Sequence, residues 1–118
     1  VNEMVRGLAS DLPAGVDLSK AKAWIVQNSS GTTATIDNSY NIKSVTRFGL
    51  GTYKVAFGIP FKADNTYVSA LSGNNYPVVY SQIAASTRFE TDMITEMTDG
   101  INYDSAFMGV FFGELENE

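Results

Sequence analysis

AKAWIVQNSSGTTATIDNSYNIKSVTRFGLGTYKVAF, residues 21–57, is the stretch that decides the fold class of this chain. Runs of β-branched and aromatic residues alternate in it with clusters of Asn, Ser, Asp and Gly, a pattern typical of strands joined by tight turns. Four strands are predicted, at residues 22–26, 32–36, 40–47 and 52–57, with turns at 28–31, 37–39 and 49–51. The alternation in the last strand places Tyr53, Val55 and Phe57 on one face, which predicts a buried side.

Trp24 and Val26 alternate in the same way within the first of these strands. We interpret Trp24 as an anchor of the hydrophobic core rather than as a platform for a ligand, because a large aromatic side chain contributes most when it is buried.

The same stretch resembles a module of the tail-fibre and tail-spike proteins of tailed bacteriophages. The resemblance rests on Ala-Lys-Ala-Trp at 21–24, a Gly-Thr turn and a Thr-rich strand, Ser-Tyr-Asn-Ile at 39–42, Ser-Val-Thr at 44–46, and Gly-Thr-Tyr at 51–53 followed by Val55 and Phe57. It covers about a third of the chain and departs from the module at Arg47-Phe48. It implies a non-enzymatic domain of the virion that attaches to the host cell surface and assembles as a homotrimer.

The rest of the chain is predicted to continue as strands. They are expected at residues 66–71 and 76–84, joined as a hairpin, then at 92–97, with a hairpin turn at Asp99-Gly100, and at 106–112. Pro77, near the start of the strand at 76–84, indicates either an edge position for that strand or a first-residue position for the proline. Residues 21–118 are therefore interpreted as an antiparallel all-β sandwich of about eight strands, and residues 1–20 as a linker or stalk, with a terminal remnant as the alternative.

The composition excludes several classes of function. The chain has 118 residues, enough for one domain, and a net charge of −5, which gives no basic footprint for nucleic acid or anionic lipid. It contains no His and no Cys, so Ser-His-Asp and Cys-His catalysis are impossible within it. No apolar run reaches the roughly 20 residues of a membrane span. Glu114, Glu116 and Glu118 are interpreted as a solvated acidic tail rather than a calcium site, so neither metal nor cofactor is predicted.

Binding is the predicted activity, because six Tyr and seven Phe exceed what a core of this size must hide. Tyr beside Asn and Asp suits sugar recognition, in which the ring packs on a sugar face and the polar groups bind hydroxyls. The receptor, a bacterial surface glycan or protein, is expected to contact the loops 72–76, 99–104 and 48–50. The candidate residues are Asn74, Asn75, Tyr76, Asn102, Tyr103, Asp104 and Phe48.

The run at 106–112 is apolar on both faces, so it should be either a central strand or part of a contact between subunits. The candidate interface residues are Phe107, Val110, Phe111 and Phe112. Two other functions stay open: a capsid-decorating or baseplate protein, and a polysaccharide depolymerase that uses two carboxylates.

Overall fold

The computed structural model describes residues 18–30, 33–73, 78–82, 86–97 and 99–118. These residues form eight strands and no helix, and therefore include no helix able to cross a membrane. The strands are β1 (Ala23–Ser30), β2 (Thr33–Tyr40), β3 (Ile42–Gly49), β4 (Thr52–Phe57), β5 (Tyr67–Gly73), β6 (Val78–Gln82), β7 (Glu90–Glu96) and β8 (Phe107–Gly113).

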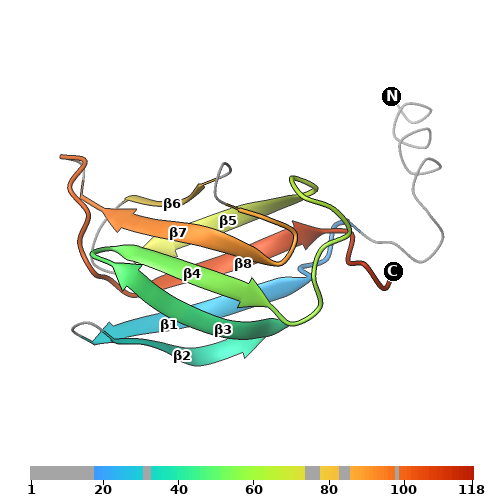
Figure 1. Ribbon diagram of the computed structural model, residues 1–118, viewed down its shortest axis with the longest axis horizontal. Helices are drawn as coiled ribbons and strands as arrows, with labels where there is room; N and C mark the ends of the chain where they lie inside the picture. The colour runs from blue at the N-terminus through green and yellow to red at the C-terminus, as the bar shows by residue number, and fades with distance from the viewer. Residues whose placement is uncertain (1–17, 31–32, 74–77, 83–85, 98) are drawn as a thin grey trace.

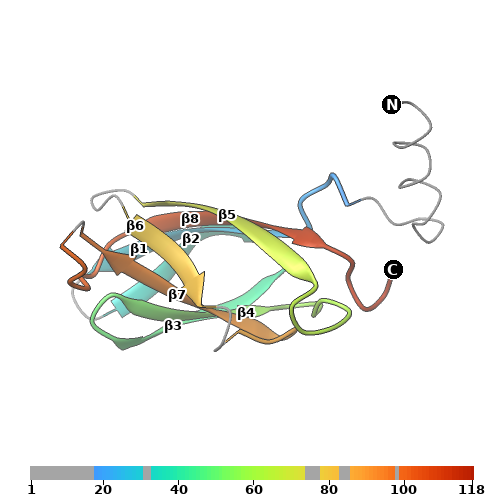
Figure 2. The ribbon, with the colours of Figure 1, turned by 90° about the horizontal axis from the view of Figure 1, so that it is seen from above.

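The strands make two antiparallel sheets of four, packed as two layers (Figures 1 and 2). The first sheet has the order β2-β1-β8-β5, and the second sheet has the order β3-β4-β7-β6. The predicted all-β sandwich of about eight strands is confirmed. β8 occupies a central position, which is one of the two alternatives expected for residues 106–112, and β6 occupies an edge position.

The core lies between the two sheets and is rich in aromatic rings. Tyr53, Val55 and Phe57 of β4 are buried, as their alternation predicted. From the first sheet, Phe107 packs on Tyr53 and Phe111 packs edge-on against Phe57, each with ring centroids 5.2 Å apart. Edge-to-face rings at this separation add to the stabilisation from burial alone.

Trp24 is not a core residue, so its predicted role as a core anchor is wrong. Ala23, Ile25 and Gln27 face inward and are almost fully buried, whereas Trp24 and Val26 face outward and are half-buried. The register with β8 explains which face of β1 points into the core, because Ala23 lies opposite Phe111 and Ile25 lies opposite Gly109. In these two pairs the larger side chain has a small partner, which fills the core without overlap.

The predicted turn at residues 37–39 lies instead within β2. The strand continues to Tyr40, and its register against β1 shifts between Ile36 and Asn38, as expected for a β-bulge with one extra residue. The chain turns at Asn41, whose φ of 54° belongs to the left-handed region that Asn tolerates. The Asn41 amide donates to the carbonyls of Lys22 and Ile59, so it holds the crossing from one sheet to the other.

The predicted hairpin formed by residues 66–84 does not exist. β5 pairs with β8 in the first sheet, whereas β6 pairs with β7 in the second sheet. The predicted hairpin turn at Asp99-Gly100 is present, since Glu96 and Asn102 form an antiparallel bridge across it and the Gly100 backbone N donates to the Met97 carbonyl. Beyond this turn the chain crosses to the first sheet, where β8 lies. Strand and turn residues show where a chain reverses, and they do not show which partner each strand takes.

The C-terminal acidic residues are not a free solvated tail. Each of the three carboxylates pairs with a basic side chain from another part of the chain: Glu114 with Lys62, Glu116 with Arg88 and Glu118 with Lys22. An isolated β-bridge between Phe61 and Leu115 anchors the same segment. The tail therefore closes one end of the sandwich.

The two ends of the sandwich differ in their connections. Residue 18 and Glu118 lie at one end, called here the proximal end (Figure 1). The turn between β3 and β4 and the start of β8 lie at the opposite end, called here the distal end (Figure 1). Residues 1–17, which hold most of the predicted stalk, are outside the described residues.

Candidate functional site

Four of the seven candidate binding residues lie at the distal end. Phe48 is the last residue but one of β3, and Asn102, Tyr103 and Asp104 belong to the connection between β7 and β8. Asn74, Asn75 and Tyr76 are outside the described residues, although β5 ends and β6 begins at the distal end (Figure 1).

Asp104 joins the connection between β7 and β8 to the turn between β3 and β4. One of its carboxylate oxygens, Oδ1, accepts hydrogen bonds from Arg47 Nε at 2.9 Å, from the Gly51 backbone N at 2.8 Å and from the Tyr53 hydroxyl at 3.3 Å. Such bonds to a charged acceptor are stronger than neutral ones. Asp104 is thus a structural member of the site, and its carboxylate orients the loops rather than standing free for a receptor.

Electrostatics around Asp104 favour its charged form. Partial burial by itself would raise the pKa of the Asp104 carboxyl, but the hydrogen bonds from Arg47 and Gly51 outweigh burial and hold the pKa below its usual value. The same bond raises the pKa of the Arg47 guanidinium. The pair is therefore charged throughout the neutral range.

Gly51 brings the two loops into direct backbone contact. Its carbonyl accepts from the Thr95 backbone N at 2.8 Å, and the Tyr103 backbone N donates to the Thr95 carbonyl at 3.1 Å. Gly51 has a φ of 65°, and a Cβ there would lie 2.6 Å from the Thr95 carbonyl oxygen. Only glycine combines this backbone conformation with this approach. The distal loops are therefore locked to each other.

The locked loops carry large apolar side chains in solvent. Phe48, Leu50 and Ile101 are 54%, 53% and 52% exposed. Lys54 lies over the Phe48 ring at 5.2 Å from its centroid. Leu50 and Ile101 lie within the predicted contact loops 48–50 and 99–104, but neither was among the candidate residues, because the candidates were chosen as aromatic and polar side chains.

The four candidate interface residues separate into two pairs. Phe107 and Phe111 are 1% and 0% exposed and belong to the protomer's own core, where no second copy can reach them. Val110 and Phe112 are half-buried and face outward from the first sheet. The central placement of β8 accounts for the apolar inner face, and leaves the apolar outer face to be explained.

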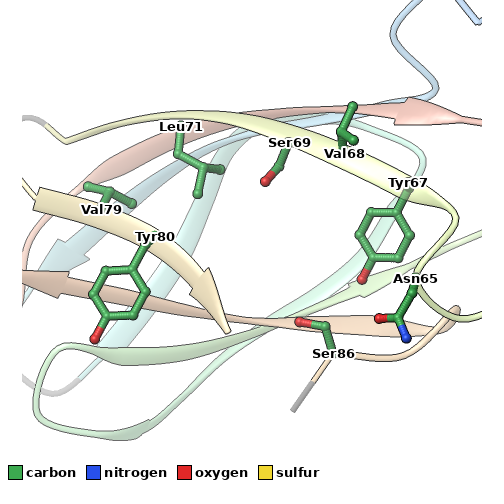
Figure 3. Close-up of a pocket in the computed structure, with 8 residues that line it drawn as sticks. All are labelled: Asn65, Tyr67, Val68, Ser69, Leu71, Val79, Tyr80 and Ser86. Atoms are coloured by element: carbon green, nitrogen blue, oxygen red, sulfur yellow. The ribbon is translucent and has the colours of Figure 1, made fainter. Parts of the chain in front are cut away.

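A cleft opens along the side of the sandwich where β5 and β6 are the edges of their sheets (Figure 3). It encloses about 430 Å³ and is lined by Asn65, Tyr67, Val68, Ser69, Leu71, Val79, Tyr80 and Ser86. Leu71 and Val79 lie toward one end of it, and Tyr67, Asn65 and Ser86 lie toward the other (Figure 3). This volume falls in the range of small-molecule sites.

The described lining of the cleft carries amide, hydroxyl and apolar groups and no charged side chain. Tyr67 donates to the Thr87 carbonyl at 2.9 Å, and burial raises the pKa of its hydroxyl. Burial likewise raises the pKa of Tyr80, so both hydroxyls stay protonated at neutral pH. A neutral, hydroxyl-rich ligand matches this lining better than an ion. Among the described residues no cluster of three metal-ligating side chains exists.

Comparison with protein-family models, with curated proteins and with solved structures gives no match to this chain.

Proposed function

We propose that this domain is the non-enzymatic receptor-binding tip of a phage tail fibre, which attaches the virion to a glycan or protein on the bacterial surface. The resemblance of residues 21–57 to tail-fibre modules motivates the proposal. The observation that carries it is the distal end, where two locked loops expose Phe48, Leu50 and Ile101 on the side of the sandwich opposite residue 18. Loops held by a rigid scaffold are the usual location of binding residues.

Preorganisation is the physical reason that the distal end suits attachment. A binding surface that is already ordered loses less conformational entropy when its partner arrives. Asp104 and Gly51 supply this order, and the three apolar side chains supply area to bury. The uncharged cleft beside β5 and β6 is a second surface with the chemistry of sugar recognition. In a homotrimer, three such tips would raise the avidity of attachment.

Two alternatives predict different partners. A capsid-decorating or baseplate protein would bury the distal loops against other virion proteins, and would not bind bacteria as an isolated domain. A depolymerase needs two carboxylates about 5 to 10 Å apart in a groove. The described residues that line the cleft include none, which favours binding over hydrolysis as the role of this cleft. Loss of capsule on treatment of cells would favour the enzyme.

The test compares two exposed phenylalanines with the same local setting. Phe48 at the distal end is 54% exposed and has Lys54 over its ring, whereas Phe89 at the proximal end is 56% exposed and has Arg88 over its ring. We expect Phe48→Ala to reduce binding of the labelled chain to host bacteria by about tenfold or more, and Phe89→Ala to leave it unchanged. Equal binding by both variants and the parent chain would refute the distal site.

A further inference from the structure

The outer face of the first sheet does not have the composition of a solvated face. An antiparallel sheet packed on one side normally alternates apolar inward and polar outward residues. β8 breaks this rule, because Met108, Val110 and Phe112 face outward between the inward residues Phe107, Gly109 and Phe111. A strand that is apolar on both faces is expected to be covered on both faces.

The neighbouring strands extend the apolar surface. Trp24 of β1 and Ala70 of β5 flank Val110, and Val26 of β1 lies opposite Met108. Val68 of β5 lies opposite Phe112 and is 68% exposed. The outward residues of the three strands, called here the apolar face, are Trp24, Val26, Asn28, Val68, Ala70, Ser72, Met108, Val110 and Phe112, and none carries a charge.

The apolar face is hollowed as well as uncharged. A shallow groove of about 340 Å³ runs over it between Trp24 and Val26 on one side and Ala70 and Ser72 on the other. In the edge-on view the first sheet forms one outer layer of the sandwich, with β1, β8 and β5 along it (Figure 2). Half-buried large side chains beside a groove give a surface that can interdigitate with a similar one.

We propose that the apolar face is the surface through which copies of this chain associate. The net charge of the chain favours this surface as the contact between copies. Two copies, each with a net charge of −5, repel each other least where the contact brings no carboxylates together. An uncharged apolar surface is complementary to itself, and every other copy of the chain in solution carries the same surface. This inference deepens the homotrimer that is part of the proposed function, because it assigns the contact to a particular face.

The size of the face agrees with part of an interface between subunits. Three strands about 4.8 Å apart and about six residues long at about 3.3 Å per residue give a face of roughly 300 Å². A stable interface buries about 800 Å² per partner. The face is thus large enough to be the centre of a contact whose rim comes from the adjoining edges. Around a three-fold axis, β8 would lie nearest the axis, with the β1 side of one copy against the β5 side of the next.

Charge placed on this face tests the inference. Ala70 is exposed, lies on an edge strand and points outward, so Ala70→Glu adds a carboxylate without disturbing the core. The matched control is Thr46→Glu, an exposed position on edge strand β3 of the second sheet, opposite Lys54. Burying an unpaired carboxylate in an uncharged apolar contact costs several kcal/mol. We expect Ala70→Glu to weaken association by at least about 100-fold and Thr46→Glu to leave it unchanged.

Two readouts report the result on the full chain. Light scattering behind a sizing column gives the mass, which for a trimer is three times the 12.8 kDa of the chain. Trp24 is the only tryptophan, so its emission reports burial of this face directly. On dilution of the parent chain, we expect the mass to fall and the emission to shift to longer wavelength together, and Ala70→Glu to show the dissociated values at every concentration.

Two results would overturn the inference: a parent chain that is monomeric at all concentrations, or an Ala70→Glu variant that associates as the parent does. Binding to bacteria separates this inference from the proposed function. If Ala70→Glu dissociates and its remaining binding still depends on Phe48, both are supported. If the parent chain associates through this face and does not bind host bacteria, the proposed function fails and the inference stands.

Discussion

The outer faces of the two sheets are built from the same fold and have opposite chemistry. On the second sheet, Lys54 of β4 lies 3.7 Å from a Glu90 carboxylate oxygen and 3.9 Å from one of Asp92, both on β7. On the first sheet, the corresponding central strands present Trp24, Met108, Val110 and Phe112. The second sheet carries ion pairs at the centre of its outer face, with Phe48 beside Lys54, whereas the first sheet carries uncharged apolar groups there. Both faces cover the same core, so packing of the core does not require the difference.

This contrast lies outside what the core requires. A sandwich needs its inner faces to be apolar, and it tolerates polar residues outside. Apolar residues on an outer face carry an aggregation risk, and a contiguous patch of them is typical of an interaction site. Four measurements test the contrast, in order of decreasing expected change in stability.

Adjacent phenylalanines on β8 separate the core from the apolar face. Phe111 is 0% exposed and packs on Phe57, so Phe111→Ala should reduce the free energy of unfolding by about 3–5 kcal/mol. Phe112 faces outward, and Phe112→Ala should reduce it by about 1 kcal/mol or less in the dissociated chain. Urea denaturation of dilute protein measures both. Equal losses would mean that the two faces of the strand are equivalent in the protomer.

The second prediction concerns Asp104, whose hydrogen bonds hold the connection between β7 and β8 against the end of β3 and the start of β4. Asp104→Ala removes the acceptor of three hydrogen bonds, and we expect a loss of about 2 kcal/mol in the free energy of unfolding. The control is Asp99→Ala, which removes one bond to the Ile101 backbone N in the exposed part of the same loop. The control should lose less than about 1 kcal/mol. A larger loss in the control would contradict the central role of Asp104.

The stability that Asp104 contributes should decrease at low pH. The pKa of Asp104 is lower in the folded chain than the roughly 3.9 of an unfolded Asp. Its contribution is therefore fully present above that value and is lost as the pH falls through the folded pKa. The gap in stability between the parent chain and Asp104→Asn should shrink between about pH 5 and pH 2. A gap that stays constant over this range would show that the carboxylate charge is not what stabilises the loops.

The smallest effect belongs to the charged face. Lys54 is 42% exposed, and exposed ion pairs contribute little, so Lys54→Met should cost about 0.5 kcal/mol. Met keeps the apolar length of the side chain beside Phe48 and removes only the charge. Thermal unfolding at low and high salt measures the cost, which should be smaller at high salt because ions screen the pairs. A loss of several kcal/mol would mean that the charged face holds the fold together.

Several elements were predictable from the sequence because the signal is local. Tyr53, Val55 and Phe57 alternate within one strand, and the burial of their face follows from that alternation. The polar turn before β5 was predictable from Asp64 and Asn65, and Asn65 has the positive φ typical of such turns. The strand at β7 was predictable because its Thr residues disfavour a helix.

Other features were not predictable because the signal is not local. Trp24 alternates with Ala23 and Ile25, so either set could face inward, and only the register with β8 decides between them. At the distal end, the loops with Phe48 and Tyr103 were chosen from their turn residues, but nothing in the sequence links Asp104 to Arg47 or Gly51 across more than 50 positions. The cleft between β5 and β6 depends on their joining different sheets, which the hairpin prediction denied.

The sequence by itself determined the fold class, the number of strands and the absence of His and Cys chemistry, since composition and alternation act over a few residues. Tertiary contacts were needed to show which face of β1 is buried, which strands are partners, and that the C-terminal carboxylates are paired. The physical reason is that a strand has two faces and two edges. Its own residues give the pattern on them, and only the neighbouring strands decide which face meets the core and which meets water or another molecule.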